Sequence, residues 1–184
     1  MGRRNQFKLD TVSIRLVKDS PVYSDFQIKS PLDAVHLIGE TICGMDREVV
    51  CVINLKADGT PINCNFASIG AVNYAMVNPR ELLKAGILSN AVNMMLVHNH
   101  PGGTLFPSSD DIRLTDRVLR VSDLVGIPLR FGKGHIIVGT DNREYFSFKE
   151  KGIIRNPREK YADDYKKIAW EREQKPAGKG RTGR

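Results

Sequence analysis

The pattern of apolar and polar positions divides the chain into alternating strands and helices. Residues 48–55 (EVVCVINL) and 93–100 (NMMLVHNH) are nearly continuous apolar runs, which are typical of strands buried on both faces. Residues 11–17 (TVSIRLV) alternate between apolar and polar side chains, and this alternation predicts a half-buried strand. Further short strands are predicted at residues 62–69, 127–131, 135–139 and 144–148.

Three segments between these strands have the start and stop signals of helices. Ser30 and Asp33 have the spacing of a capping box, and Pro31 occupies the first helical position. Asn78 begins a second helix in the same way, and Gly126 follows the last apolar position of a third. The helices are predicted at residues 30–43, 78–90 and 108–126.

The connections between these elements indicate the fold class. Asp58-Gly59 is a turn signal that makes residues 62–69 the hairpin partner of 48–55, whereas strands elsewhere alternate with helices. This combination predicts an α/β fold with a mixed β-sheet flanked by helices. We expect an N-terminal strand segment (1–27), one domain (28–150), and a basic polar tail (151–184) that is helical and then disordered.

The charge of the chain is concentrated in this tail. Residues 150–184 hold +5 of the net charge of +7, so the rest of the chain is nearly neutral and lacks the basic stripe of a nucleic-acid-binding domain. A Gly-, Lys- and Arg-rich end can neutralise phosphates without reading bases. We expect weak, non-specific nucleic acid binding through the tail, with a merely solubilising tail as the alternative.

Other features argue against membrane insertion and export. No apolar run is long enough to span a bilayer, and the N-terminus has no apolar signal region. The three cysteines, Cys43, Cys51 and Cys64, lack the CxxC spacing of a zinc knuckle, and their odd number argues against a disulfide framework. We therefore expect a cytoplasmic protein with reduced thiols and no membrane association.

The candidate chemistry lies in LVHNHPGGTLFPSSDD, residues 96–111. Side chains two apart on a strand point the same way, so His98 and His100 face one side and Asn99 the other. Two imidazoles at this spacing favour a zinc site, and a catalytic site needs a third protein ligand and a water. Asp111, in the first turn of the next helix, can supply a carboxylate.

Each residue also has a purely structural interpretation. Ser108 and Asp111 form an approximate capping box, and His98 and His100 could be packed, hydrogen-bonded core residues. The combined pattern HxH-x7-SxxD favours a metal site, because independent structural explanations would have to coincide at matched spacing.

This pattern is that of the JAMM (MPN-plus) metalloproteases. The stretches HNHP, PS..D, GIPL, HIIVG and YFSF further resemble the bacterial RadC-like JAB-domain family, over about residues 28 to 150. The resemblance implies zinc bound by His98, His100 and Asp111, with Glu48 as general base and Ser108 supporting the oxyanion. It also implies an architecture like that of cytidine deaminases, with a mixed sheet flanked by helices.

The sequence departs from the family in three places. Gly102 replaces a serine of HNHPSG, and Gly134 stands where relatives often have Asp before the histidine of HIIVG. We therefore expect His135 to be a core residue or one that supports a ligand, and His36, alone within a helix, to be structural. The long helical N-terminal region of full-length RadC proteins does not precede the domain in this sequence.

These residues favour a zinc-dependent hydrolase that cleaves a peptide or isopeptide bond of a peptide or protein substrate. The alternative is a DNA-repair-associated or mobile-element accessory protein in which the zinc site is structural. It relies on the family's traditional link to DNA repair and on the basic tail. A zinc deaminase is disfavoured because H-x-E and P-C-x-x-C are absent.

Overall fold

A five-stranded sheet with the order β2-β1-β3-β4-β5 lies at the centre of the computed structural model, which describes residues 11, 13, 15–70, 77–129 and 134–154. β3 and β4 run parallel, and the other neighbouring pairs run antiparallel, so the predicted mixed sheet is confirmed. The strands are β1 (Val49–Leu55), β2 (Pro61–Ile69), β3 (Asn93–Asn99), β4 (His135–Val138) and β5 (Tyr145–Ser147).

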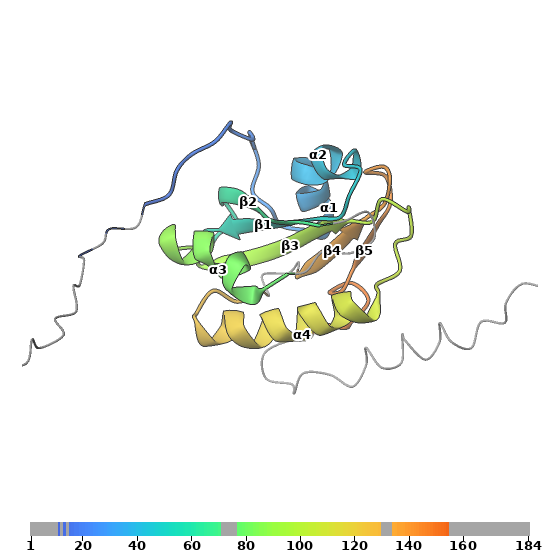
Figure 1. Ribbon diagram of the computed structural model, residues 1–184. Helices are drawn as coiled ribbons and strands as arrows, with labels where there is room; N and C mark the ends of the chain where they lie inside the picture. Colours follow the sequence, from blue (N-terminus) through green and yellow to red (C-terminus); the bar gives the residue numbers. More distant parts are fainter. Residues whose placement is uncertain (1–10, 12, 14, 71–76, 130–133, 155–184) are drawn as a thin grey trace, which may run out of the picture.

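Helices cover both faces of the sheet (Figure 1). On one face, α1 (Pro31–Ala34), a π-helical turn η1 (Val35–Gly39) and α2 (Glu40–Cys43) follow one another where a single helix is predicted. The capping box at its start is present, with the Asp33 backbone N–H donating to Ser30 Oγ at 3.2 Å.

The opposite face is covered by α3 (Pro79–Leu88) and α4 (Ser109–Leu124), which confirm the other two predicted helices. α4 is the crossover between the parallel strands β3 and β4, and parallel strands require such a connection. No helix in the described part of the chain is long and apolar enough to cross a membrane.

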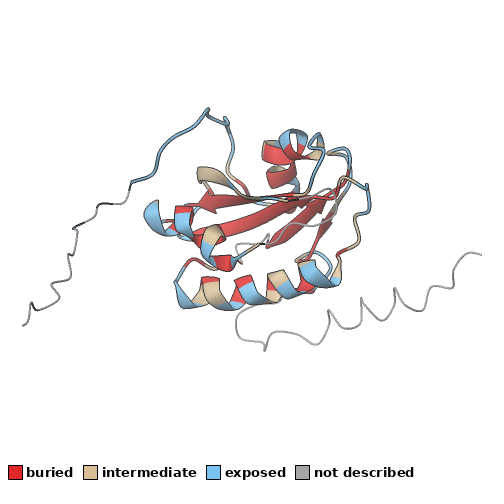
Figure 2. Cartoon of the chain, in the orientation of Figure 1, coloured by how far each residue is buried: buried red, intermediate tan, exposed pale blue. Residues whose placement is uncertain are grey.

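The central strands are buried because each contributes side chains to two cores (Figure 2). Val50, Val52 and Leu96 belong to the core under α3 and α4. The intervening residues of the same strands, such as Cys51 and Val97, belong to the core under α1 and α2. This alternation explains why β1 and β3 read as continuous apolar runs.

Two predicted strands are wrong. None of residues 11, 13 and 15–17 lies in a strand, and Val17 is 87% exposed. The alternating pattern is not sufficient here, because a strand also needs a neighbouring strand to pair with and a core on which to pack. Ile127–Leu129 also form no strand, since the Ile127 and Leu129 backbone N–H groups donate to the carbonyl and hydroxyl of Ser122 at the end of α4. Residues 130–131 and the predicted helical and disordered tail from residue 155 lie outside the described residues.

The turn into β4 supplies the first testable prediction. Gly134 has a φ of +61°, and a Cβ there would lie 2.5 Å from Cδ1 of Ile154. Gly134→Ala should lower the free energy of unfolding by about 1–2 kcal/mol or more, because L-residues are strained at this φ. Urea unfolding measures this, with Gly102→Ala as control, since a Cβ at Gly102 meets nothing within 4 Å. Equal stability of the two variants would contradict the prediction.

Candidate metal site

The two histidines of the motif lie at the carboxyl end of β3, beneath the start of α4. His98 follows the alternation of Leu96 and so faces the α4 side of the sheet, and His100 comes just after the strand. Both are buried, at 2% and 6% exposure. Their Nε2 atoms lie 2.9 Å apart.

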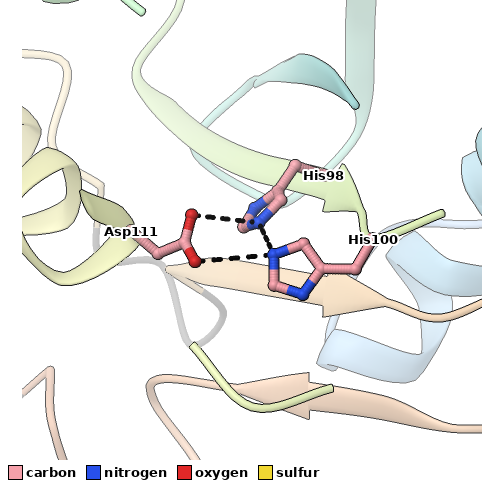
Figure 3. Close-up of side chains that lie close together, drawn as sticks. All are labelled: His98, His100 and Asp111. Atoms are coloured by element: carbon pink, nitrogen blue, oxygen red, sulfur yellow. Dashed lines mark hydrogen bonds and ion pairs between the residues drawn. The ribbon is translucent and has the colours of Figure 1, made fainter. Parts of the chain in front are cut away.

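Asp111 reaches these nitrogens from the first turn of α4. Its Oδ1 lies 3.2 Å from His98 Nε2 and its Oδ2 lies 3.4 Å from His100 Nε2 (Figure 3). The same carboxylate closes the capping box, because Oδ2 accepts the Ser108 backbone N–H at 2.7 Å. The structural and the metal-binding interpretations of Asp111 are thus compatible, since both follow from one side-chain position.

The spacing of these donors suits a tetrahedral ion. All three ligand atoms lie within 4.8 Å of one another. Bonds of about 2.0–2.1 Å to zinc give tetrahedral ligand–ligand distances of about 3.3 Å, near the separations of 2.9, 3.2 and 3.4 Å found here. Two imidazole nitrogens and one carboxylate oxygen are also a ligand set that zinc accepts, with a fourth position for water.

His100 is oriented for metal binding by the loop that follows it. Its Nδ1 lies 2.7 Å from the carbonyl oxygen of Thr104, which can only accept a hydrogen bond. In the neutral ring, Nδ1 therefore carries the proton and Nε2 has a free lone pair. Gly103, with a φ of +76°, makes the tight turn that brings this carbonyl back to the ring.

The electrostatics of the metal-free cluster reflect its need for positive charge. Burial alone would raise the pKa of Asp111, but hydrogen bonds with His100 and His98, together with the charge of His98, hold it well below the usual value. Burial likewise opposes protonation of His100, yet its hydrogen bonds with Asp111 and Thr104 and the charges of Asp111 and Glu48 raise its pKa. Without a metal, a proton on an imidazole partly takes the place of the cation.

Glu48 comes just before β1, the strand next to β3. β1 and β3 pair antiparallel with Val50 opposite His98, and continuing this register by two residues places Glu48 opposite His100. The effect of the Glu48 charge on the pKa of His100 agrees with this placement. Glu48 is half-buried, and its carbonyl accepts the Gly70 backbone N–H at 2.8 Å.

Asn99 fixes the backbone on both sides of Glu48. Its Oδ1 accepts the Val49 N–H at 2.7 Å, and its Nδ2 donates to the Arg47 carbonyl at 3.0 Å. The middle residue of HNH thus holds the start of β1 in place while the histidines face the site. The sequence interpretation placed Asn99 on the other side of the strand but gave it no role.

Ser108 is engaged with Asp111. Its hydroxyl donates to Asp111 Oδ2 at 2.6 Å and accepts the Asp111 backbone N–H at 3.1 Å. The single hydroxyl hydrogen is therefore used to orient a candidate ligand, and an oxyanion could receive it only after the hydroxyl rotates away from Asp111.

His135 lies behind His98 and outside the group of three candidate ligands. Its Nε2 is 2.6 Å from His98 Nδ1 and its Nδ1 is 2.7 Å from Thr115 Oγ1. Complete burial holds the pKa of His135 well below its usual value. Thr115 was not singled out from the sequence, although its position four residues after Asp111 on one helix was a usable signal. His36 is exposed on η1, away from this cluster.

A mixed sheet flanked by helices, with a His-His-Asp group at one end of its central strand, fits a JAB-type domain. A family model for the RadC-like JAB domain matches residues 28–153, and the chain belongs to this family. A UPF0758 protein of Desulfitobacterium hafniense (strain DSM 10664 / DCB-2) is 39% identical over 127 residues, which are 69% of this chain and 54% of the relative. A UPF0758 protein of Clostridium kluyveri is 38% identical over 130 residues, 71% and 55% of the two chains. The chain spans about half the length of these relatives.

The depressed pKa of Asp111 predicts how the metal-free protein responds to acid. A carboxyl whose pKa is lower in the folded than in the unfolded chain contributes stability above the unfolded value of about 3.9, and this is lost as the pH falls below it. The free energy of unfolding in the presence of a chelator should therefore decline below about pH 4, by at most about 1.4 kcal/mol per pH unit from this group.

Asp111→Asn should make this decline shallower, as urea unfolding at pH 3 to 6 would measure. The matched control is Asp110→Asn, which alters an exposed neighbour in the same first turn of α4. The prediction is contradicted if the two variants decline with equal slopes.

Proposed function

We propose that this chain is a zinc-dependent hydrolase that cleaves the amide bond of a peptide or isopeptide. The observation that supports the proposal is the convergence of His98 Nε2, His100 Nε2 and the Asp111 carboxylate. Glu48 comes just before β1, and its charge acts on His100. Three protein ligands leave a fourth position for water, as in catalytic rather than structural zinc sites.

Zinc, when bound, lowers the pKa of a coordinated water from about 15.7 to about 7 and polarises a substrate carbonyl. Glu48 would accept a proton from the attacking water and pass it to the leaving amine, whose departure requires protonation. Asn99 holds the backbone of Arg47 and Val49, the two neighbours of Glu48. The N–H of Gly70, just after β2, donates to the Glu48 carbonyl. The backbone that carries the carboxylate is therefore fixed. A base held in place in this way loses little freedom on reaching the reactive geometry.

Ser108 would have two roles in succession. In this structure its hydroxyl orients Asp111. During attack on a carbonyl, the same hydroxyl would rotate to donate to the developing oxyanion, while its backbone N–H keeps Asp111 Oδ2 in place at 2.7 Å. The carboxylate ligand thus retains a hydrogen-bond donor at both stages.

The metal ligands give the first test. We expect about one zinc per chain in protein purified without added metal, and loss of stoichiometric zinc in His98→Ala and in Asp111→Ala. Elemental analysis by mass spectrometry measures this. His36→Ala is the matched control, because it removes an exposed histidine outside the cluster and should leave the zinc content unchanged. Full zinc in a His98→Ala, His100→Ala double variant would place the metal elsewhere and refute the proposal.

The general base gives the second test. Glu48→Gln should retain zinc and fold but lose hydrolysis of a quenched fluorescent peptide library by roughly 10²–10⁴-fold, because the amide keeps the size and removes the proton acceptor. Glu40→Gln, an exposed substitution on α2, should leave turnover unchanged. A turnover number for Glu48→Gln equal to that of the wild type would exclude Glu48 from the mechanism.

A further inference from the structure

We propose that Thr115 and His135 are positioning residues that fix the ring proton of His98 on Nδ1 and so present His98 Nε2 as a metal ligand. The inference rests on the proposed function, because it assigns these residues to the same site. Neither residue belongs to the group that could hold the metal. Both lie behind it, in a hydrogen-bonded chain that begins and ends on candidate ligands.

The chain runs from one ligand residue to another through three short contacts. His98 Nδ1 lies 2.6 Å from His135 Nε2, and His135 Nδ1 lies 2.7 Å from Thr115 Oγ1. Thr115 Oγ1 in turn lies 2.6 Å from the carbonyl oxygen of Asp111. His135 is fully buried, Thr115 is 3% exposed, and the His135 ring stacks on Phe148 at 4.8 Å, so the chain is shielded from water.

One assignment of hydrogens satisfies all three contacts for a neutral His135. The Asp111 carbonyl can only accept, so the single hydroxyl hydrogen of Thr115 is donated to it. Thr115 Oγ1 must then accept from His135 Nδ1–H, which leaves His135 Nε2 as an acceptor. His135 Nε2 accepts from His98 Nδ1–H, so a neutral His98 has its free lone pair on Nε2, the atom that lies 3.2 Å from Asp111 Oδ1.

The same logic predicts what happens when the hydroxyl is removed. In Thr115→Val the isosteric side chain has no acceptor, so the buried His135 N–H is no longer held on Nδ1. If the proton moves to Nε2, it is donated to His98 Nδ1, and the His98 proton moves to Nε2, where it blocks the metal. Thr115→Ser keeps the hydroxyl and should preserve the chain. If zinc affinity falls in Thr115→Val and not in Thr115→Ser, the effect comes from the lost hydrogen bond and not from changed side-chain packing.

The proton positions are measurable without metal. In ¹⁵N-labelled, metal-free full-length protein, two-bond ¹H–¹⁵N correlation spectra should show the His135 proton on Nδ1 in the wild type and in Thr115→Ser, and not in Thr115→Val. A wild-type His135 protonated on Nε2, or a pattern unchanged in Thr115→Val, would overturn the inference. This measurement needs no metal, so it tests the positions of the ring protons even if the chain binds no zinc. Failure to bind zinc would refute the proposed function and leave the assignment of the ring protons intact.

Zinc affinity is the second readout, measured by competition with a chromophoric chelator. Thr115→Val should weaken zinc binding by about 10- to 100-fold, and Thr115→Ser should bind like the wild type. Ser122→Ala is the control, since it removes another buried hydroxyl of α4, bonded to Leu119 and Leu129, and should not change the affinity.

His135→Phe gives an independent test in case Thr115→Val fails to fold. It preserves an aromatic ring against Phe148 but offers His98 no acceptor, so it should also weaken zinc binding by about 10- to 100-fold. Affinities of His135→Phe or Thr115→Val equal to that of the wild type, or a loss in Thr115→Ser as large as in Thr115→Val, would overturn the inference.

Discussion

The site depends on bringing three electron-rich atoms together in a buried place. His98 Nε2, His100 Nε2 and the Asp111 carboxylate lie within 2.9 to 3.4 Å of one another, and unpaired lone pairs at such distances repel. Burying them is costly unless a cation lies among them, because water cannot solvate them there. The rest of the domain supports this arrangement. β3 lies between β1 and β4, so its histidines are covered on both sides, and the crossover helix α4 begins at the carboxyl end of β3.

Because of this placement, Asp111 both stabilises the start of α4 and serves as a candidate metal ligand. Asp111 is the third residue of α4, where a carboxylate closes the capping box and is favoured by the positive end of the helix dipole. Oδ2 accepts the backbone N–H and hydroxyl of Ser108, while Oδ1 faces His98. The helix start therefore aims the carboxylate, and little side-chain entropy remains to be lost when a metal binds. For this reason a capping signal and a metal signal coincide in the sequence.

The sequence predicted what depends on local pattern and left out what depends on tertiary contacts. Caps such as Ser30 and Ser108 and the apolar runs of β1 and β3 are local, and the structure has them as expected. The alternation at 11–17 did not produce a strand in its described residues, because pairing depends on a neighbour that the pattern does not specify. The π-helical turn at 35–39 and the hold of Asn99 on the start of β1 arise from packing and register, which no short motif encodes.

The replacement of the family's Asp by Gly134 shows the same division between local and tertiary information. With Gly134 in place of that Asp, the sequence predicted that His135 is a core residue or one that supports a ligand. In the structure Gly134 adopts a φ of +61°, and the partner of His135 Nδ1 is the hydroxyl of Thr115 instead. A hydroxyl leaves the buried ring neutral, whereas a carboxylate would favour its positive charge beside His98. The Nε2 atom of a neutral His135 can accept a hydrogen bond from His98 Nδ1–H. The Thr115 hydroxyl, a neutral acceptor where a charged one was expected, thus helps keep the first histidine of the motif available as a ligand.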